Sequence, residues 1–221
     1  MDIIKKALEE GRKTLSEYES RLVLEPAGIF FAAGALVKTR EEAVREAERM
    51  GYPVVLKGCS AELTHKTEAG MVALNINSAQ GVAEIFDELT GKAQNLDGVL
   101  VEKMVRGSRE FVIGLSQDSQ FGPCVMFGLG GIFTEALKDV TFRVAPLTKE
   151  DALEMIDEIK TKALLGQFRG SPAVDKESLA RALVGIGDLA TRYDTIAEID
   201  INPLIIVGDK PVAVDALVVL K

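Results

Sequence analysis

The sequence predicts an α/β protein made of two α+β lobes, with short strands and helices mixed rather than arranged in a regular βαβ array. Helical and strand patterns alternate along the chain, and several strands are short and hairpin-like. The length of 221 residues allows one domain or two small lobes. No low-complexity linker interrupts the chain, so we expect the lobe boundary in a short connection just after Glu102.

The first half of the chain alternates helical and strand patterns. The expected elements, in order, are helix 2–19, helix 40–50, strand 52–57, strand 72–76, helix 79–90 and strand 98–102. Thr39 and Glu42 match a capping box at the start of the second helix, and Gly51 ends that helix.

The second half holds more strands and two longer helices. The expected elements are strand 110–114, strand 123–127, helix 149–164, helix 176–193 and a final hairpin from Glu198. Thr148 and Asp151 form a second capping box.

The final hairpin carries polar side chains on one face of a strand. Side chains alternate along a strand, so Glu198, Asp200 and Asn202 share a face while the isoleucines between them enter the core. We expect Pro203 to end the strand ladder.

A turn should then return the chain to this face. Gly208 and Asp209 supply the turn, and the returning strand brings Asp215 back towards Asn202. Hard oxygen ligands on rigid strands suit Mg²⁺, which keeps several waters and recruits phosphate oxygens. The alternative is an ordinary polar strand edge in water.

Three charged residues at strand ends are candidates for binding a nucleotide. Lys57 ends an apolar strand where its ammonium can reach a phosphate, although a lysine at a strand end also snorkels to solvent. Glu102 and Glu110 can accept hydrogen bonds from an adenine amino group or from ribose hydroxyls. Isolated glutamates are otherwise solvated.

A glycine-rich segment and an arginine are candidates for binding phosphate. The amides of Gly130 and Gly131 can form an anion-binding nest, although three nearby glycines also make ordinary tight turns. The segment is neither a Walker loop nor a dinucleotide fingerprint. Arg143 can bind a phosphoryl group in a bidentate manner.

His65 is the only histidine, and its polar neighbours predict an exposed loop. A neutral imidazole can attack a phosphoryl group and carry it as a phosphoramidate. A lone loop histidine is otherwise inert.

Composition excludes several classes of function. The net charge of −8 argues against a nucleic-acid binder, and no apolar run is long enough to span a membrane. The N-terminus lacks a secretory signal. Cys59 and Cys124 have no metal-binding spacing and are expected to be reduced thiols in a cytoplasmic protein.

Five segments together resemble a known family. They are residues 51–57, 64–70, 121–135, 142–147 and 198–204. The chain resembles, from about residue 16 onward, the ATP-grasp (beta) subunits of ADP-forming, or NDP-forming, acyl-CoA synthetases, the ADP-forming acetate–CoA ligase family. It is more distantly similar to the beta subunit of succinyl-CoA synthetase.

The resemblance implies an ATP-grasp fold in which two lobes clamp a nucleotide. The smaller lobe would be 21–103, and the larger would be 1–20 plus 104–221. The implied activity interconverts acyl-CoA, ADP and phosphate with acid, CoA and ATP through phosphohistidine. ATP or ADP and Mg²⁺ are the implied cofactors, and a CoA-binding alpha subunit is the implied partner.

The resemblance also implies roles for individual residues. Lys57 would hold nucleotide phosphates, Glu102 and the backbone at Met104 would bind adenine, and Glu110 would bind ribose. Asn202 and Asp215 would hold Mg²⁺ with Asp200 nearby, and His65 and Arg143 would be catalytic, His65 as the second phosphohistidine of the relay. The nucleotide-binding set is completed by Gly70, Gly130 and Gly131.

Two departures and two alternatives accompany this resemblance. Met71 stands where the family has a second glycine, and residues 25–31 depart from the usual pattern. A stand-alone ATP-grasp ligase that makes an acylphosphate would use the same sites but give His65 no task. A nucleotide-binding regulatory module without catalysis is the other alternative. The acyl group and the choice between ADP and GDP stay open.

Overall fold

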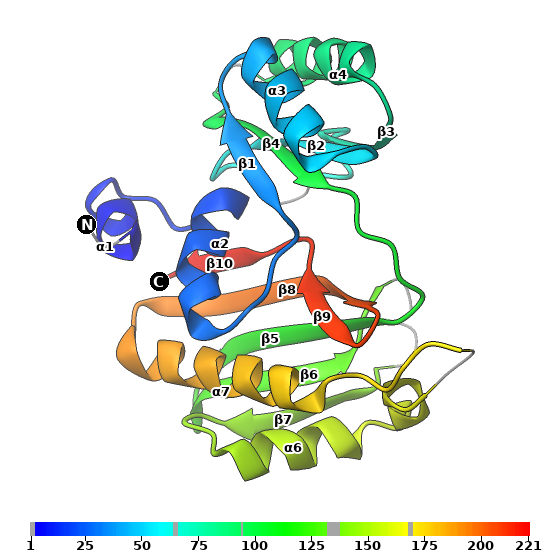
Figure 1. Ribbon diagram of the computed structural model, residues 1–221. Helices are drawn as coiled ribbons and strands as arrows, with labels where there is room; N and C mark the ends of the chain where they lie inside the picture. The colour runs from blue at the N-terminus through cyan, green and yellow to red at the C-terminus, as the bar shows by residue number, and fades with distance from the viewer. Residues whose placement is uncertain (1–2, 64–65, 94, 132–137, 168–169) are drawn as a thin grey trace.

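Two α+β lobes form the molecule, as the sequence predicts (Figure 1). The computed structural model describes residues 3–63, 66–93, 95–131, 138–167 and 170–221. Each lobe has its own sheet and its own cluster of buried apolar side chains. Within these described ranges, no helix has the length and apolar character needed to cross a bilayer.

The smaller lobe is a four-stranded antiparallel sheet in the order β1-β4-β2-β3. Its strands are β1 (Gly34–Val37), β2 (Val54–Cys59), β3 (Val72–Ile76) and β4 (Gly98–Lys103). The helices α3 (Arg40–Met50) and α4 (Ala79–Lys92) pack together on one face of this sheet (Figure 1). The core between them is a cluster of aliphatic side chains that includes Val54, Leu56 and Val101.

The larger lobe is a six-stranded sheet in the order β10-β8-β5-β6-β7, with β9 paired to β8. Its strands are β5 (Glu110–Asp118), β6 (Gly122–Leu129), β7 (Val140–Val144), β8 (Ile196–Val207), β9 (Lys210–Ala213) and β10 (Leu217–Leu220). The helices α6 (Lys149–Glu158) and α7 (Lys176–Arg192) lie side by side over one face (Figure 1).

The N-terminal helices belong to the larger lobe. The helices α1 (Ile3–Glu9) and α2 (Glu17–Leu24) and the 3₁₀ turn η1 (Glu25–Ala27) precede β1. Leu24, Ile29 and Phe31 pack in the core of the larger lobe, whereas the predicted smaller lobe began at residue 21. The chain therefore passes from the core of the larger lobe to that of the smaller lobe close to β1, and it returns after β4.

Capping residues fix several helix boundaries. Both predicted capping boxes are confirmed, because the Thr39 hydroxyl accepts from the Glu42 amide and the Thr148 hydroxyl accepts from the Asp151 amide. The prediction of one helix over 2–19 is wrong. Gly11 adopts a φ of 70° after α1, and Ser16 caps a new helix.

The predicted helix 149–164 is also divided. α6 ends at Glu158, and a 3₁₀ turn, η3, covers Lys162–Leu165. The carboxylate of Asp139 accepts hydrogen bonds from the amides of Lys160 and Thr161, which replaces the helical pairing at that point.

Three strand features differ from the sequence prediction. β1 and β7 were not predicted. β8 continues through Pro203 to Val207, so the expectation that Pro203 ends the ladder is wrong. The pairing of β8 with β5 shifts register between Phe111 and Ile113, opposite the part of β8 that contains Pro203. Proline is tolerated at such a shift because the ladder needs no amide donor there.

Candidate functional site

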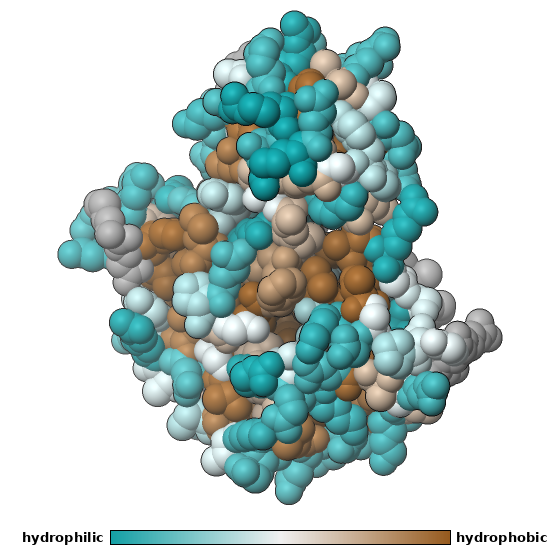
Figure 2. Space-filling view, viewed as in Figure 1, coloured by the Kyte–Doolittle hydropathy of each residue, from teal (hydrophilic) through white to brown (hydrophobic). Residues whose placement is uncertain are grey.

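A small polar cavity lies where the larger lobe meets the segment between β2 and β3 of the smaller lobe. The lining residues are Leu15, Glu17, Leu63, Lys66, Asp200, Asn202, Asp215, Ala216 and Leu217. The structure therefore brings together the three predicted metal-binding residues, Asp200, Asn202 and Asp215. Figure 2 shows apolar side chains gathered at the level between the lobes, whereas the outer helices of the smaller lobe are largely hydrophilic.

The strand β8 positions two of these side chains by simple alternation. Ile199 and Ile201 are fully buried in the core of the larger lobe, while Asp200 and Asn202 face the cavity. Asp215 follows β9, and its Oδ1 accepts a hydrogen bond of 2.8 Å from the Ala216 amide. The predicted face of the hairpin and the return of Asp215 towards Asn202 are thus found in the structure.

Two buried lysines converge on one glutamate beside this cavity. The Lys57 Nζ lies 2.6 Å from Glu17 Oε1 and 2.7 Å from Glu102 Oε2, and it also donates to the carbonyl of Val214. The Lys66 Nζ lies 2.7 Å from Glu17 Oε2 and 2.7 Å from Asp215 Oδ1. Glu17 therefore bridges the two ammonium groups and joins the lobes.

The sequence prediction missed Glu17 and Lys66. Glu17 opens α2, and it lies with Ser20 and Leu24 on the buried side of that helix. A carboxylate and a hydroxyl on the core-facing stripe of a short helix are the signal that could have identified this position. Lys66 follows His65 directly, but its pairing with Asp215 joins residues 149 positions apart in the chain.

The charges in the cavity perturb one another. Burial by itself lowers the pKa of the Lys57 ammonium, but Glu102 and Glu17 hold that pKa above its ordinary value. Burial, together with the neighbouring carboxylates of Asp215 and Glu198, raises the pKa of Asp200 to about 6. Burial opposes ionisation of Asp215, yet Lys66 and Lys57 keep its pKa below the ordinary value.

The donor set of the cavity fits a magnesium ion. Asp200, Asn202 and Asp215 offer oxygen donors of the kind that Mg²⁺ prefers, and a cation held here would offset the burial and the neighbouring carboxylates that raise the pKa of Asp200. The Lys66 ammonium already sits against Asp215, so this position accommodates positive charge. Among the described residues, no group of three or more His, Cys, Asp or Glu side chains that could hold a metal ion is found.

The glycine-rich segment contacts the same region. The Gly131 amide donates to Asn202 Oδ1 at 3.3 Å, and the Gly130 amide donates to the Glu110 carbonyl at 2.9 Å. Gly131 has a φ of 71°, which favours glycine, and a Cβ there would lie 2.2 Å from Glu110 Oε2, so that side chain would have to move. Both amides reach protein acceptors, which differs from the open anion nest of the sequence prediction.

The predicted adenine-binding residues lie near the end of β4 and just after it, where the chain leaves the smaller lobe. Glu102 is buried, and its carboxylate contacts Lys57 and lies 3.6 Å from Arg21 Nη1. The amide of Met104 donates to the Pro53 carbonyl at 3.1 Å. This arrangement makes the Glu102 carboxylate the anchor of Lys57.

Other predicted residues lie apart from the cavity or outside the described part of the chain. Arg143 is on the edge strand β7, and its guanidinium pairs with Glu158 of α6. Gly70 is in an exposed turn, and its carbonyl accepts from Lys92. His65 lies outside the described residues.

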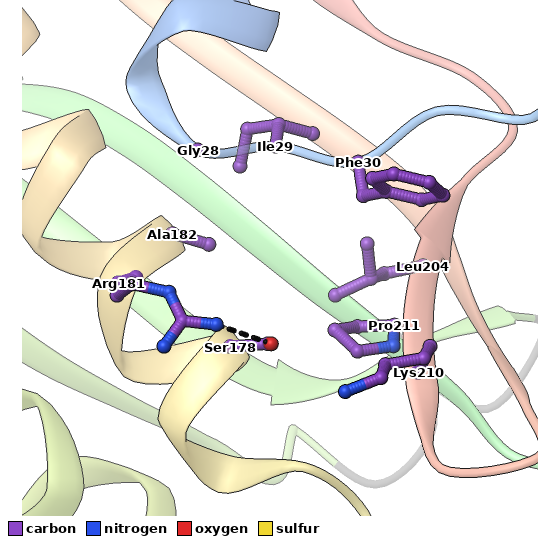
Figure 3. Close-up of a pocket in the computed structure, with 9 residues that line it drawn as sticks. All are labelled: Gly28, Ile29, Phe30, Ser178, Arg181, Ala182, Leu204, Lys210 and Pro211. Carbon is purple, nitrogen blue, oxygen red and sulfur yellow. Dashed lines mark hydrogen bonds between the residues drawn. The ribbon is translucent and has the colours of Figure 1, made fainter.

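The two departures from the family pattern have structural counterparts. Met71 is buried in the core of the smaller lobe, where a Cβ on Gly58 would meet its Cε at 2.3 Å. In the segment 25–31, Phe31 is buried in the larger lobe and Phe30 is exposed. Figure 3 shows Phe30 beside a separate cavity, which is lined by the loop before β1, α7, β8 and β9. This cavity has a volume of about 320 Å³ and contains none of the predicted site residues.

Comparison with known proteins gives consistent matches over the whole chain. A family model described as an ATP-grasp domain matches residues 6–220. The beta subunit of ADP-forming acetate–CoA ligase I from Pyrococcus furiosus is 45% identical, over 99% of this chain and 97% of its own length.

Solved structures agree with these sequence matches. One match is the dinucleotide forming acetyl-coenzyme A synthetase 1 of Ca. Korarchaeum cryptofilum, solved in complex with coenzyme A, Ca-AMPCP and HgCl⁺. It is 40% identical and superposes with a TM-score of 0.93, and the match covers 100% of this chain and 99% of that chain. A complex of the same enzyme with coenzyme A and Mg-AMPPCP, its phosphohistidine segment pointing towards the nucleotide binding site, gives a TM-score of 0.87 at 40% identity and the same coverage.

Proposed function

The chain belongs to the ATP-grasp family and, within it, to the beta subunits of ADP-forming acetate–CoA ligases, and from this we propose that it is the nucleotide-handling subunit of an ADP-forming acyl-CoA synthetase. The complex interconverts acyl-CoA, ADP and phosphate with acid, CoA and ATP through phosphohistidine. The observation that carries this proposal is the cavity in which Asp200, Asn202 and Asp215 of the larger lobe meet Lys66 of the smaller lobe, beside the buried Lys57.

The metal ion, when bound, neutralises charge on the phosphates of the nucleotide. Asn202 and Asp215 would hold it, and Asp200 lies beside them. The relatives solved with Mg-AMPPCP and with Ca-AMPCP support this assignment, because a divalent cation accompanies the nucleotide analogue in each.

The protein's own residues orient the phosphates and the nucleoside. Glu17 and Glu102 fix the Lys57 ammonium in one position, and a preorganised positive charge stabilises transferring phosphate better than a mobile one. Glu110 would bind the ribose, while Glu102 and the backbone at Met104 would border the adenine. Gly130 and Gly131 allow the chain to turn closely past Glu110 and Asn202.

The phosphoryl group would pass through His65. In the direction of ATP formation, a terminal oxygen of ADP bonds to phosphorus as the Nε2–P or Nδ1–P bond of the phosphohistidine breaks. The electron pair of that bond returns to the ring nitrogen, and because the other ring nitrogen carries a proton, neutral histidine is restored. Lys66, the next residue, lies in the cavity beside Asp215, which supports a route for this segment into the nucleotide site.

A second subunit completes the enzyme. The Pyrococcus furiosus relative is named as a beta subunit, which implies an alpha subunit. We propose that the partner binds CoA and selects the acid, so acyl-CoA and phosphate reach this chain only through the complex. We also propose a cytoplasmic location, which the free thiols of Cys59 and Cys124 support.

The experiment that tests this function compares His65→Asn with the unaltered chain, each assembled with its CoA-binding partner. We expect acid-labile, base-stable labelling of this chain from radioactive phosphate and acyl-CoA in the unaltered complex only. His65→Asn should retain Mg·ATP binding by calorimetry and lose net ATP formation. Full activity of the variant would contradict the histidine relay and favour a stand-alone ligase, whereas Mg·ATP binding without any turnover of the unaltered complex would favour a regulatory module.

A further inference from the structure

The Lys66 side chain crosses the boundary between the lobes. Lys66 belongs to the segment between β2 and β3, and only 8% of its side chain is exposed. Its Nζ lies between Glu17 of α2 and Asp215, which follows β9, at 2.7 Å from each carboxylate. Its backbone carbonyl accepts from the Met71 amide, which connects it to the core of the smaller lobe.

Asp215 is therefore neutralised by groups of the protein itself. Its Oδ1 accepts from the Lys66 ammonium and from the Ala216 amide. A divalent ion bound to the same carboxylate would place three positive charges within a few ångströms of one another, and such repulsion is strong away from bulk water. The Asp215 side chain is 41% exposed, so an ion can approach it.

Lys57 has a different environment. Its ammonium is held by Glu17, Glu102 and the Val214 carbonyl, and none of these groups is a predicted metal ligand. A metal ion at Asp215 would therefore leave every hydrogen-bond partner of Lys57 in place. Of the two buried lysines, only Lys66 competes directly with the metal ion.

We infer that Lys66 is an internal cation which Mg²⁺ displaces from Asp215, so that metal binding breaks this ion pair between the lobes and frees the ammonium for the incoming phosphates. The inference rests on the proposed function, because it takes Asp215 as a metal ligand. Glu17 retains contact with Lys66 during the exchange, since its Oε2 pairs with Lys66 while its Oε1 pairs with Lys57. Lys66 is then a positioning residue for the segment that contains His65.

The exchange can be followed by the reactivity of lysine amines. The full-length chain is treated with an amine-acylating reagent with and without Mg²⁺, and the rate at each lysine is read by mass spectrometry. We expect Mg²⁺ to increase the rate at Lys66 several-fold, because the amine loses its contact with the Asp215 carboxylate and becomes more accessible to the reagent. Lys92 is the internal control, because it lies on the same lobe and pairs with Glu88 and the Gly70 carbonyl.

Variants separate exchange from simple charge effects. Lys66→Gln should bind Mg²⁺ about tenfold more tightly by calorimetry, the factor expected for removing a competing, largely buried ion pair. Lys66→Arg, which keeps the charge, should bind Mg²⁺ about as the unaltered chain does. Circular dichroism checks that each variant is folded.

Each contrary outcome has a defined meaning. If Asp215→Asn abolishes Mg²⁺ binding but Lys66 reactivity does not respond to Mg²⁺, the exchange is wrong while the metal site stands. If Lys66→Gln binds Mg²⁺ no more tightly than the unaltered chain, including the case in which neither binds, the exchange is also wrong. If Asp215→Asn keeps normal Mg²⁺ affinity, the metal assignment within the proposed function fails.

Discussion

Replacing Asp200 with asparagine should stabilise the metal-free protein at neutral pH. Asp200 is half-buried, and burial together with Asp215 and Glu198 raises its pKa to about 6. The substitution Asp200→Asn keeps the shape of the side chain and removes the charge. The variant therefore isolates the free-energy cost of holding this carboxylate ionised beside two others.

The direction of the pH dependence follows from the two pKa values. Unfolded Asp200 titrates at its ordinary value of 3.8, so between that pH and about 6 the folded state binds more protons than the unfolded state. The stability of the unaltered chain therefore falls as the pH rises through this window, and above it the full cost is present. A shift of about two units corresponds to about 3 kcal/mol. We expect the variant to gain about 1–2 kcal/mol at neutral pH, because the side chain is partly solvated and asparagine also loses hydration.

Urea unfolding across this pH range measures the effect. The difference in unfolding free energy between Asp200→Asn and the unaltered chain should be greatest above about pH 7. It should vanish below about pH 3, where the Asp200 side chain is neutral in both the folded and the unfolded chain. Asp188→Asn, at an exposed position on α7, is the matched control and should give a difference close to zero throughout. A loss of stability in Asp200→Asn at neutral pH, or a difference independent of pH, would refute the reasoning.

Further predictions concern packing and metal binding. Gly185→Ala in α7 should lower the unfolding free energy by about 3 kcal/mol or more, because its Cβ would lie 1.8 Å from the Ala27 carbonyl oxygen. Gly91→Ala in α4, with open space around the new Cβ, should instead raise it by about 0.5–1 kcal/mol, and urea unfolding tests both signs. Asp215→Ala and Asn202→Ala should each weaken Mg²⁺-dependent ATP binding and reduce turnover by orders of magnitude with the fold intact. Calorimetry that shows normal Mg·ATP affinity and normal turnover in both variants would remove these residues from the metal site.

Local sequence patterns predicted most of the helices and strands because these elements depend on nearby residues. The caps at Thr39 and Thr148 and the alternation around Asp200 each involve residues within a few positions of one another. The prediction failed where a distant group decides the boundary. The carboxylate of Asp139, from another part of the chain, accepts from the Lys160 amide just after α6 ends at Glu158.

In the candidate site, too, the predicted residues depend on nearby sequence and the missed residues depend on distant contacts. Asp200 and Asn202 were predictable because a strand places alternate residues on one face, and a tight turn returns the chain towards them. The roles of Glu17 and Lys66 depend on how the two lobes meet, and a single sequence contains no local record of that contact. The family resemblance supplied residue roles but not the carboxylate that joins Lys57 to Lys66.

The arrangement of charge around the cavity explains why a metal ion and a nucleotide would bind there together. Glu17 and Asp215 are neutralised by lysines within the protein, whereas Asp200 has only other carboxylates among the groups that raise its pKa. Two electrostatic conditions follow: the carboxylates around Asp200 repel one another, and the Lys66 ammonium loses a partner once Mg²⁺ displaces it from Asp215. The ion satisfies the first condition and the phosphates of a nucleotide satisfy the second. Each ligand thus removes an electrostatic cost that the other alone would leave, which predicts that Mg²⁺ and ATP bind with positive cooperativity.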